Sequence, residues 1–178
     1  PPMGPGEPSQ ATAPYVLGID PGGAGPNGEL APEADDVAWA GRRDIAPAVG
    51  ALRAQVAAGR VGSLSPRFYG VPTEYSQRRT NEQDAPFVLE QARLDGVDAM
   101  VLLPYRPVCH QTHALVARHL EAAGMPTVVI GSARDVVEQA GVARFLFTDI
   151  ELCHPTGHPD RPEEARLVCA EALEDRKS

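Results

Sequence analysis

From residue 97 onward, short apolar runs alternate with longer amphipathic stretches, and this alternation restricts the possible folds more than any other feature. The apolar runs are "VDAMVLLP", "PTVVIG" and "RFLFTDI". Each is followed, directly or after a loop, by a segment with apolar residues at helical spacing. Strands that alternate with helices form a parallel sheet covered by helices on both faces. We therefore predict an α/β fold, a single-domain three-layer sandwich with a mainly parallel sheet of the flavodoxin or Rossmann type.

The chain before residue 97 has a weaker pattern. Residues 1–14 are rich in proline and glycine and have little to bury, so we expect a disordered tail followed by one domain over 15–178. The elements expected before residue 97 are a strand at 15–19, a helix from Asp44 to about Gly59, a strand or extended loop at 65–72, and a helix that begins at Thr80 or Asp84 and ends at Gly96. Pro47 then falls in the first turn of its helix, where its missing N–H is tolerated.

The charge and composition exclude several classes of partner. A formal net charge of -8 gives no positive field for binding nucleic acid or an anionic membrane. No apolar stretch approaches the roughly 20 residues of a membrane span, and the N-terminus lacks a basic segment followed by an apolar one. The 3 cysteines are an odd number without a closely spaced pair, which favours a reducing compartment. We expect a cytoplasmic protein whose partners are small molecules or proteins, with homo-oligomerisation left open.

Ligands of open parallel sheets bind at the carboxyl ends of the strands, so the loops there are the first place to look for a site. Those loops are "PYRPVCHQ", "GSARD" and "ELCHPTGHP", and we expect all three along one edge. Cys109 then lies near a helix N-terminus beside Arg106, and both features favour a thiolate. The alternative, which is the more common one for a lone cysteine in an intracellular protein, is a small packed side chain.

Two short stretches combine cysteine with histidine. "CHQTH" and "CHPTGH" together hold four of the 5 histidines. A helix that begins at Cys109 places this residue and His113 on one face at i and i+4, a workable spacing for two ligands of a soft divalent metal. The predicted metal ligands are Cys109, His113, Cys153, His154 and His158, with zinc, iron or copper as the ion. Histidines in loops and at helix starts also cap or hydrogen-bond, and neither stretch matches a zinc-finger pattern.

Other side chains are candidates for holding a substrate. Arg78 and Arg79, paired before a helix, are suited to a carboxylate, although such a run is more often a solvated turn. Tyr105 and Ser132 lie in the loops expected at the same edge and complete the predicted substrate-binding set. The glycine-rich "GIDPGGAGP" lacks both the lysine of a phosphate-binding loop and the spacing of a dinucleotide fingerprint, so no nucleotide cofactor is predicted.

Several stretches of the sequence occur together in one known family. "SQRRT", "PVCHQT", "LVARHLEAAGMPTVV" and "RFLFTD" resemble the B component of glycine, sarcosine and betaine reductases, and more closely its non-selenocysteine bacterial relatives. The resemblance covers most of the chain after about residue 45. It implies reductive cleavage of a carbon–nitrogen bond, in which a cysteine or selenocysteine of the loop leading to "PVCHQT" takes part. It also implies a partner protein whose thiol or selenol receives the group that is removed.

The chain departs from this family at the expected site. Where the resemblance places the first cysteine or selenocysteine of a cysteine-proline-valine-cysteine motif, this chain has Arg106, and only Cys109 is retained. The other residues at this edge that differ from the family pattern are His113, Cys153, His154 and His158. These changes indicate a site converted from thiol redox chemistry to one that uses imidazole, with a bound metal as one alternative.

We therefore expect a small-molecule enzyme of specialised metabolism on a reductase-like scaffold, acting on a small polar or anionic substrate. Cys109, Arg106 and His110 are its predicted catalytic residues, and a metal-dependent form of the same site would use the ligands named above. Two alternatives remain open: a thiol-dependent reductase component that uses Cys109, and a noncatalytic homologue that binds a partner protein. Fast alkylation of Cys109 favours the thiol, and bound metal favours the metal-dependent enzyme.

Overall fold

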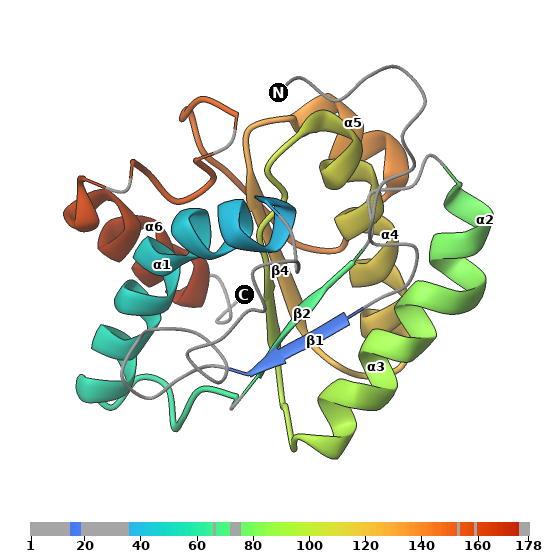
Figure 1. The fold of residues 1–178 in the computed structure, drawn as a ribbon, viewed down its shortest axis with the longest axis horizontal. Coiled ribbons are helices and arrows are strands. Elements are labelled where there is room, and N and C mark those ends of the chain that lie inside the picture. The colour runs from blue at the N-terminus through green and yellow to red at the C-terminus, as the bar shows by residue number, and fades with distance from the viewer. Residues whose placement is uncertain are drawn as a thin grey trace.

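The centre of the fold is a parallel sheet, as the alternating pattern predicts. The computed structural model describes residues 15–18, 36–65, 67–71, 76–152, 154–158 and 160–174. Within these ranges, strands β3 (Met100–Leu102), β4 (Thr127–Gly131) and β5 (Phe145–Phe147) pair in parallel in that order. Figure 1 shows the fold with the middle strand, β4, labelled. The tail at 1–14 lies outside the described residues, so its disorder stays a prediction.

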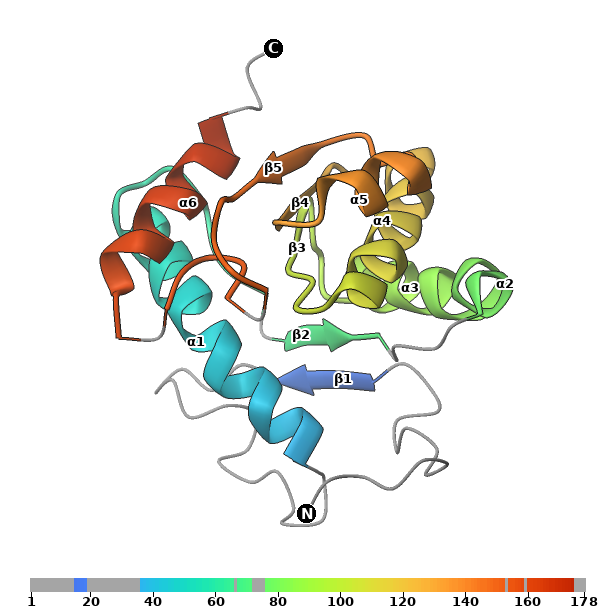
Figure 2. The same cartoon turned by 90° about the horizontal axis from the view of Figure 1, so that it is seen from above.

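Helices lie on both sides of the sheet, as Figure 2 shows. One side carries α3 (Ala85–Leu94), α4 (Pro107–Ala122) and α5 (Arg134–Ala140), and the other carries α1 (Asp36–Ala57) and α6 (Pro162–Glu174). Helices α1 and α6 pack against each other through small buried side chains that include Ala51 and Ala165. Leu103 packs against this cluster. The predicted α/β class, with a parallel sheet between helical layers, is confirmed.

Proline and glycine mark the limits of the later helices, but α4 begins at Pro107, two residues before the start predicted at Cys109. Proline is the first residue of both α4 and α6, a position where an N–H group has no partner within the helix. Gly124 and Gly141 follow the ends of α4 and α5 with φ of 83° and 77°, a conformation that glycine adopts without strain. None of the helices in the described ranges is both long enough and apolar enough to span a lipid bilayer.

The first helix is longer than predicted. α1 begins at Asp36 rather than Asp44, so Pro47 lies inside the helix and not in its first turn. A proline in the interior removes one backbone hydrogen bond and crowds the preceding turn, but its fixed φ is close to the helical value. Pro47 therefore does not mark the start of this helix.

The second helical segment also begins earlier than predicted. Ser76 is the N-cap of α2 (Gln77–Arg79), and its Oγ accepts a hydrogen bond of 3.3 Å from the N–H of Arg79. The helix continues through a π-helical turn, η2 (Thr80–Asp84), into α3. Thr80 and Asp84, the predicted caps, are buried inside this continuous helix, where η2 packs on α4. The prediction was wrong because their environment is set by that tertiary contact and not by neighbouring residues.

Two further strands form a separate sheet. β1 (Tyr15–Gly18) and β2 (Arg67–Gly70) pair antiparallel, and within the described residues they do not join β3. The strand predicted at 15–19 is confirmed, and the segment 65–72 contains a strand. The sheet that forms the edge of interest is therefore the three-stranded parallel one alone.

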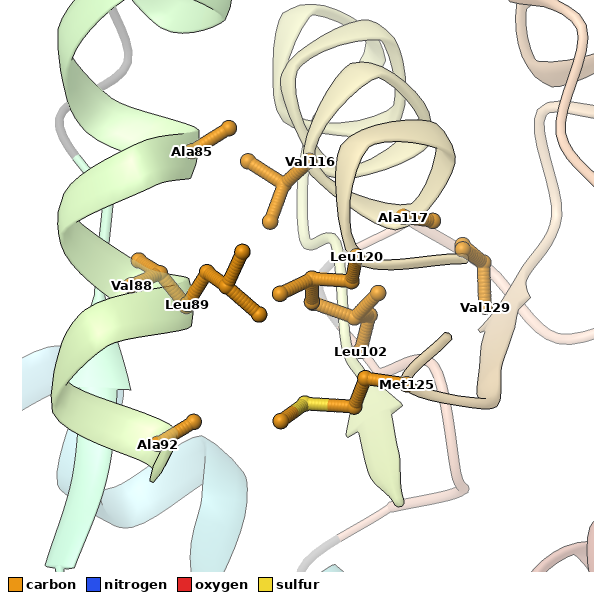
Figure 3. Close-up of a cluster of buried hydrophobic side chains, with 10 residues drawn as sticks. All are labelled: Ala85, Val88, Leu89, Ala92, Leu102, Val116, Ala117, Leu120, Met125 and Val129. Carbon is orange, nitrogen blue, oxygen red and sulfur yellow. The ribbon is translucent and has the colours of Figure 1, made fainter. Parts of the chain in front are cut away.

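The main core lies between α3, α4 and the parallel sheet. Side chains from these elements point toward one another in Figure 3. The cluster consists of Ala85, Val88, Leu89, Ala92, Leu102, Val116, Ala117, Leu120, Met125 and Val129. Leu120 is fully buried, and burial of one leucine side chain contributes about 1.5–3 kcal/mol. This core holds α4 on the sheet, so that the N-terminus of α4 stands at the carboxyl edge of β3.

A charged cluster fixes the C-terminal end of α4. Glu121 accepts hydrogen bonds from Nη2 of Arg144 at 2.6 and 2.8 Å, and from the N–H and Oγ1 of Thr127 at 2.5 and 2.9 Å. Burial acts to raise the pKa of Glu121, but the hydrogen bonds from Arg144 and Thr127 outweigh it and hold this pKa below its ordinary value. Because Thr127 begins β4 and Arg144 directly precedes β5, the cluster joins α4 to both strands.

Two histidines fix the first turns of α4. His110 donates from Nδ1 to the carbonyl oxygen of Arg106 at 2.8 Å and accepts at Nε2 from the N–H of Ser132 at 3.3 Å. The imidazole of His110 is therefore neutral, because one ring nitrogen donates while the other accepts. His113 donates from Nδ1 to the carbonyl oxygen of Cys109 at 2.8 Å. Burial lowers the pKa of both imidazoles, that of His113 to about 4.

Replacing Glu121 by glutamine tests the charged cluster. The variant loses the carboxylate that Arg144 and Thr127 share, and we expect the free energy of unfolding at neutral pH to fall by about 1–3 kcal/mol. Because the folded-state pKa is lowered, the stabilisation is present above the unfolded-state pKa and is lost as pH falls through the folded-state pKa. Urea denaturation at several pH values should therefore show the difference between wild type and variant shrinking in acid.

Glu138→Gln is the matched control for this experiment, because Glu138 is an exposed glutamate on the neighbouring helix α5. This variant should unfold at the same urea concentration as the wild type. A loss in Glu121→Gln that stays constant down to about pH 3 would show that the charge of Glu121 contributes nothing.

The two histidines predict that stability falls in mild acid. Their folded-state pKa values lie below the ordinary value of 6.5, so the unfolded chain binds protons first as pH decreases. Stability is therefore greatest above about pH 6.5 and declines toward about pH 4, by at most about 1.4 kcal/mol per pH unit for each histidine. Urea denaturation of His113→Gln should give a shallower slope than the wild type. The neighbouring, non-titrating substitution Gln111→Ala should keep the wild-type slope, and equal slopes in all three proteins would contradict the assignment.

Candidate functional site

The carboxyl edge of the parallel sheet, called the rim below, is formed by residues 104–109, 131–133, 148–152 and 154–158. His110 joins the first loop to the second, because its ring bonds the carbonyl oxygen of Arg106 and the N–H of Ser132. Thr148 joins the second loop to the third and also closes the third loop on itself. The N–H of Thr148 donates to the carbonyl oxygen of Gly131 at 2.9 Å, and Oγ1 of Thr148 donates to the carbonyl oxygen of Pro155 at 3.2 Å. The loops that the sequence placed along one edge therefore lie there together.

Cys109 is half-buried in the first turn of α4, two residues after the opening proline. The N-terminal end of a helix stabilises negative charge, because its first N–H groups have no partners within the helix. Arg106, the N-cap residue, is exposed and has an extended backbone. By contrast, burial raises the pKa of Cys169 in α6 to about 12, so this thiol stays protonated at neutral pH. Of these two cysteines, Cys109 is the one placed for reaction.

His110, predicted to be catalytic, lies in the interior. Its side chain is 0% exposed, and both ring nitrogens are bonded to backbone groups, those of Arg106 and Ser132. A catalytic acid or base must reach the substrate, so the catalytic role of His110 stays a prediction that would need the ring to leave one of these backbone partners. A Cβ at Gly131 would overlap the His110 ring, so the glycine allows the close approach. In this structure His110 joins the start of α4 to the end of β4 behind the rim.

The four described residues among the five predicted metal ligands, Cys109, His113, His154 and His158, do not form one group. Cys153 lies outside the described residues, so its place in a site stays a prediction. Among the residues that the structure describes, no cluster of three potential ligand atoms within 4.8 Å of one another includes Cys109 or His113. Nδ1 of His113 instead bonds the carbonyl oxygen of Cys109, which satisfies the ring within the helix. The i and i+4 spacing does bring the two residues into contact. The His113 ring, however, bonds the backbone carbonyl of Cys109 and not its thiol.

His154 and His158 do lie together, and they are joined by a residue that the sequence analysis missed. The carboxylate of Glu151 and the two imidazoles place one ligand atom each within 4.8 Å of the others. Oε1 of Glu151 is 3.4 Å from Nε2 of His158, and the two histidine ring centroids are 4.6 Å apart. The spacing E-x-x-H-x-x-x-H is the signal that could have identified Glu151, because both intervals are short enough for one loop to bring the three together.

The predicted substrate-binding arginines occupy α2. The side chain of Arg78 is 84% exposed, and its Nε lies 4.0 Å from Glu82. Nε of Arg79 lies 3.9 Å from Oδ1 of Asp84, whose side chain is fully buried. A buried carboxylate needs a compensating charge, so Arg79 has a structural role in this helix. Arg78 is the one of the pair that solvent reaches freely.

Tyr105 and Ser132, the other two residues predicted to bind substrate, are on the rim. Both are half-buried, Tyr105 in the loop before α4 and Ser132 directly after β4. The N–H of Ser132 donates to His110. These positions place Tyr105, Ser132 and Arg106 on the same edge of the sheet as Cys109.

Known proteins resemble part of this chain, and the resemblances agree with one another. No family model matches the chain, and no solved structure matches it. The chain is 30% identical over 97 residues to the gamma subunit of D-proline reductase from Acetoanaerobium sticklandii, which covers 54% of this chain and 40% of that protein.

Two further relatives are gamma subunits of glycine reductase complex component B. The chain is 24% identical over 128 residues to the one from Carboxydothermus hydrogenoformans, which covers 72% of this chain and 29% of that protein. It is 26% identical over 131 residues to the one from Peptoclostridium acidaminophilum, which covers 71% of this chain and 30% of that protein. The chain therefore spans less than half the length of each of these relatives. It is a distant relative of the gamma subunits of D-proline reductase and of glycine reductase component B.

Proposed function

We propose that this chain is a component of a reductase complex that acts at the rim on a small polar or anionic substrate, with Cys109 as the reactive thiol. The observation that carries the proposal is the position of Cys109. It is half-buried in the first turn of α4, at the carboxyl edge of a parallel sheet, on a scaffold related to reductase subunits. A fold alone supports no function, so the weight rests on this residue and its surroundings.

The neighbours of Cys109 fit an anionic substrate. Arg106 is exposed at the N-cap of α4, and a guanidinium can hold a carboxylate through two hydrogen bonds. The N-terminus of α4 adds a partial positive charge at the same place. In the proposal Arg106 binds the substrate, Tyr105 and Ser132 line its path, and His110 keeps the helix start in place behind the rim.

Thiol exchange at Cys109 would need sulfur atoms from a partner protein. A dithiol reductant needs two cysteines. Among the cysteines that the structure describes, Cys109 and Cys169, the latter is buried in α6, and Arg106 stands three residues before Cys109 where the family motif has a cysteine. In the proposal the Cys109 thiolate attacks a disulfide of the partner protein, which forms a mixed disulfide and releases the second sulfur as a thiolate. The exchange conserves electrons within the pair of proteins. It would make this chain act together with a partner protein that carries a redox-active pair of cysteines, as a subunit does.

Selective alkylation tests the proposal. In the folded chain at neutral pH, iodoacetamide should modify Cys109 on the order of 10-fold or more faster than Cys169, because an accessible thiol at a helix N-terminus is the more reactive one. Arg106→Ala should slow the reaction of Cys109, whereas Arg166→Ala, an exposed arginine on α6, should not. Peptide mass spectrometry locates and times each modification.

Two outcomes of this experiment would count against a reactive thiol. A Cys109 that reacts no faster than Cys169 in the folded chain would be a packed residue. A Cys109 rate that is identical in wild type and Arg106→Ala would remove Arg106 from the site. The first outcome would leave this chain as a homologue that binds a partner without performing chemistry.

A further inference from the structure

We propose that Glu151, His154 and His158 form a binding site for one divalent transition-metal ion in the segment between β5 and α6. This inference is independent of the role of Cys109, since no ligand of the site comes from α4. Two imidazole nitrogens and one carboxylate oxygen are the donor set of catalytic zinc sites that keep an open position. The same donors suit iron and copper, whereas Mg²⁺ and Ca²⁺ prefer oxygen ligands alone.

The separations between ligand atoms fit such an ion. A tetrahedral shell with bonds of about 2.0–2.1 Å keeps its ligand atoms about 3.3 Å apart. Nε2 of His158 and Oε1 of Glu151 are already 3.4 Å apart. The nitrogen of His154 lies within 4.8 Å of both, so a small rotation of its side chain completes three corners. The fourth corner is left for water or a substrate.

The backbone of this segment is held in place by its own hydrogen bonds. The N–H of His154 donates to the carbonyl oxygen of Glu151 at 3.2 Å, and the N–H of Gly157 donates to that of His154 at 3.0 Å. These two turns bring the three side chains to one side of the loop. Backbone hydrogen bonds of this kind reduce the freedom that is lost when a metal binds, which favours affinity.

The rest of the protein anchors the same loop at two points. Oγ1 of Thr148 donates to the carbonyl oxygen of Pro155 in the interior. The N–H of His158 donates to Oε2 of Glu164 in the first turn of α6 at 3.1 Å, and Gly157 has φ of 116° where a Cβ would overlap Glu164. Arg161, the nearby cation, is paired with Glu164 at 3.1 Å. Its positive charge is therefore offset by a carboxylate other than that of Glu151.

The accessibility of the three side chains also suits a metal site that exchanges with solvent. The side chain of Glu151 is 67% exposed and that of His158 is 32% exposed, while His154 is half-buried. An ion held here would have protein on one side and an open coordination position on the other. Because the loop belongs to the rim, that position would face the same edge of the sheet as Cys109.

Zinc titration of the full chain tests the proposal. The protein, purified without a polyhistidine tag and stripped with a chelator, is titrated with Zn²⁺ in a calorimeter. We expect one Zn²⁺ per chain and no competition from Mg²⁺ or Ca²⁺. His154→Gln and His158→Gln should each weaken Zn²⁺ binding on the order of 100-fold. Loss of a residue that only orients a metal ligand can already lower the affinity this much, and loss of the ligand itself should lower it at least as much.

Matched variants distinguish this site from zinc binding elsewhere on the chain. His119→Gln, a half-buried histidine on α4, and Cys109→Ser should both bind Zn²⁺ like the wild type. Circular dichroism checks that each variant is folded, and Zn²⁺ should raise the melting temperature of the wild type but not of His158→Gln. Absence of binding at about 0.1 mM Zn²⁺, or equal affinity in wild type and both histidine variants, would overturn the proposal. A large loss in Cys109→Ser would overturn its independence from α4.

Discussion

The arrangement of the rim depends on one buried imidazole. His110 is fully buried and joins the start of α4 to the end of β4, through the carbonyl oxygen of Arg106 and the N–H of Ser132. Gly131 makes room for the ring, because any side chain there would overlap it. An unpaired backbone N–H in this place would carry a penalty of about 1–3 kcal/mol. The position of Cys109, one residue before His110, follows from this contact.

The opposite end of α4 is held as firmly as its start. Glu121 binds Arg144 and Thr127, and between the two ends Val116 and Leu120 are buried against α3 and the sheet. A helix fixed at both ends presents its first turn as a rigid element. Sites built on such elements are placed more accurately than sites on loops. The structure thus gives Cys109 a defined position on the edge where ligands of parallel sheets bind.

Much of this architecture could be predicted from the sequence, because it depends on local signals. The apolar runs marked β3, β4 and β5, and Gly124 and Gly141 marked the ends of α4 and α5. The predictions of local structure were wrong where a tertiary contact determines the environment of a residue. Asp84 was predicted as a cap and is a buried residue of a π-helical turn. The burial of His110 between two backbone partners likewise depends on packing that the sequence does not specify.

The candidate site was predictable in part for the same reason. The position of Cys109 follows from the helix start, and the pairing of His154 with His158 follows from a short loop. Glu151 was not predicted, because an exposed glutamate after a strand carries no sequence signal of metal binding. Its place beside the two histidines depends on how the loop folds. Cys109 and His113 share a helix, but the direction of the His113 ring toward a carbonyl oxygen is a matter of packing that spacing does not specify.

The central claim is that Cys109 is a thiol poised to exchange with a partner disulfide at the rim. The most direct test is to incubate the folded chain with oxidised glutathione and measure the intact mass, then locate the adduct by peptide mapping. We predict one glutathione per chain on Cys109 and none at that position in folded Cys109→Ser. A Cys109 that stays unmodified in the folded chain, while the urea-unfolded chain is modified there, would contradict the claim.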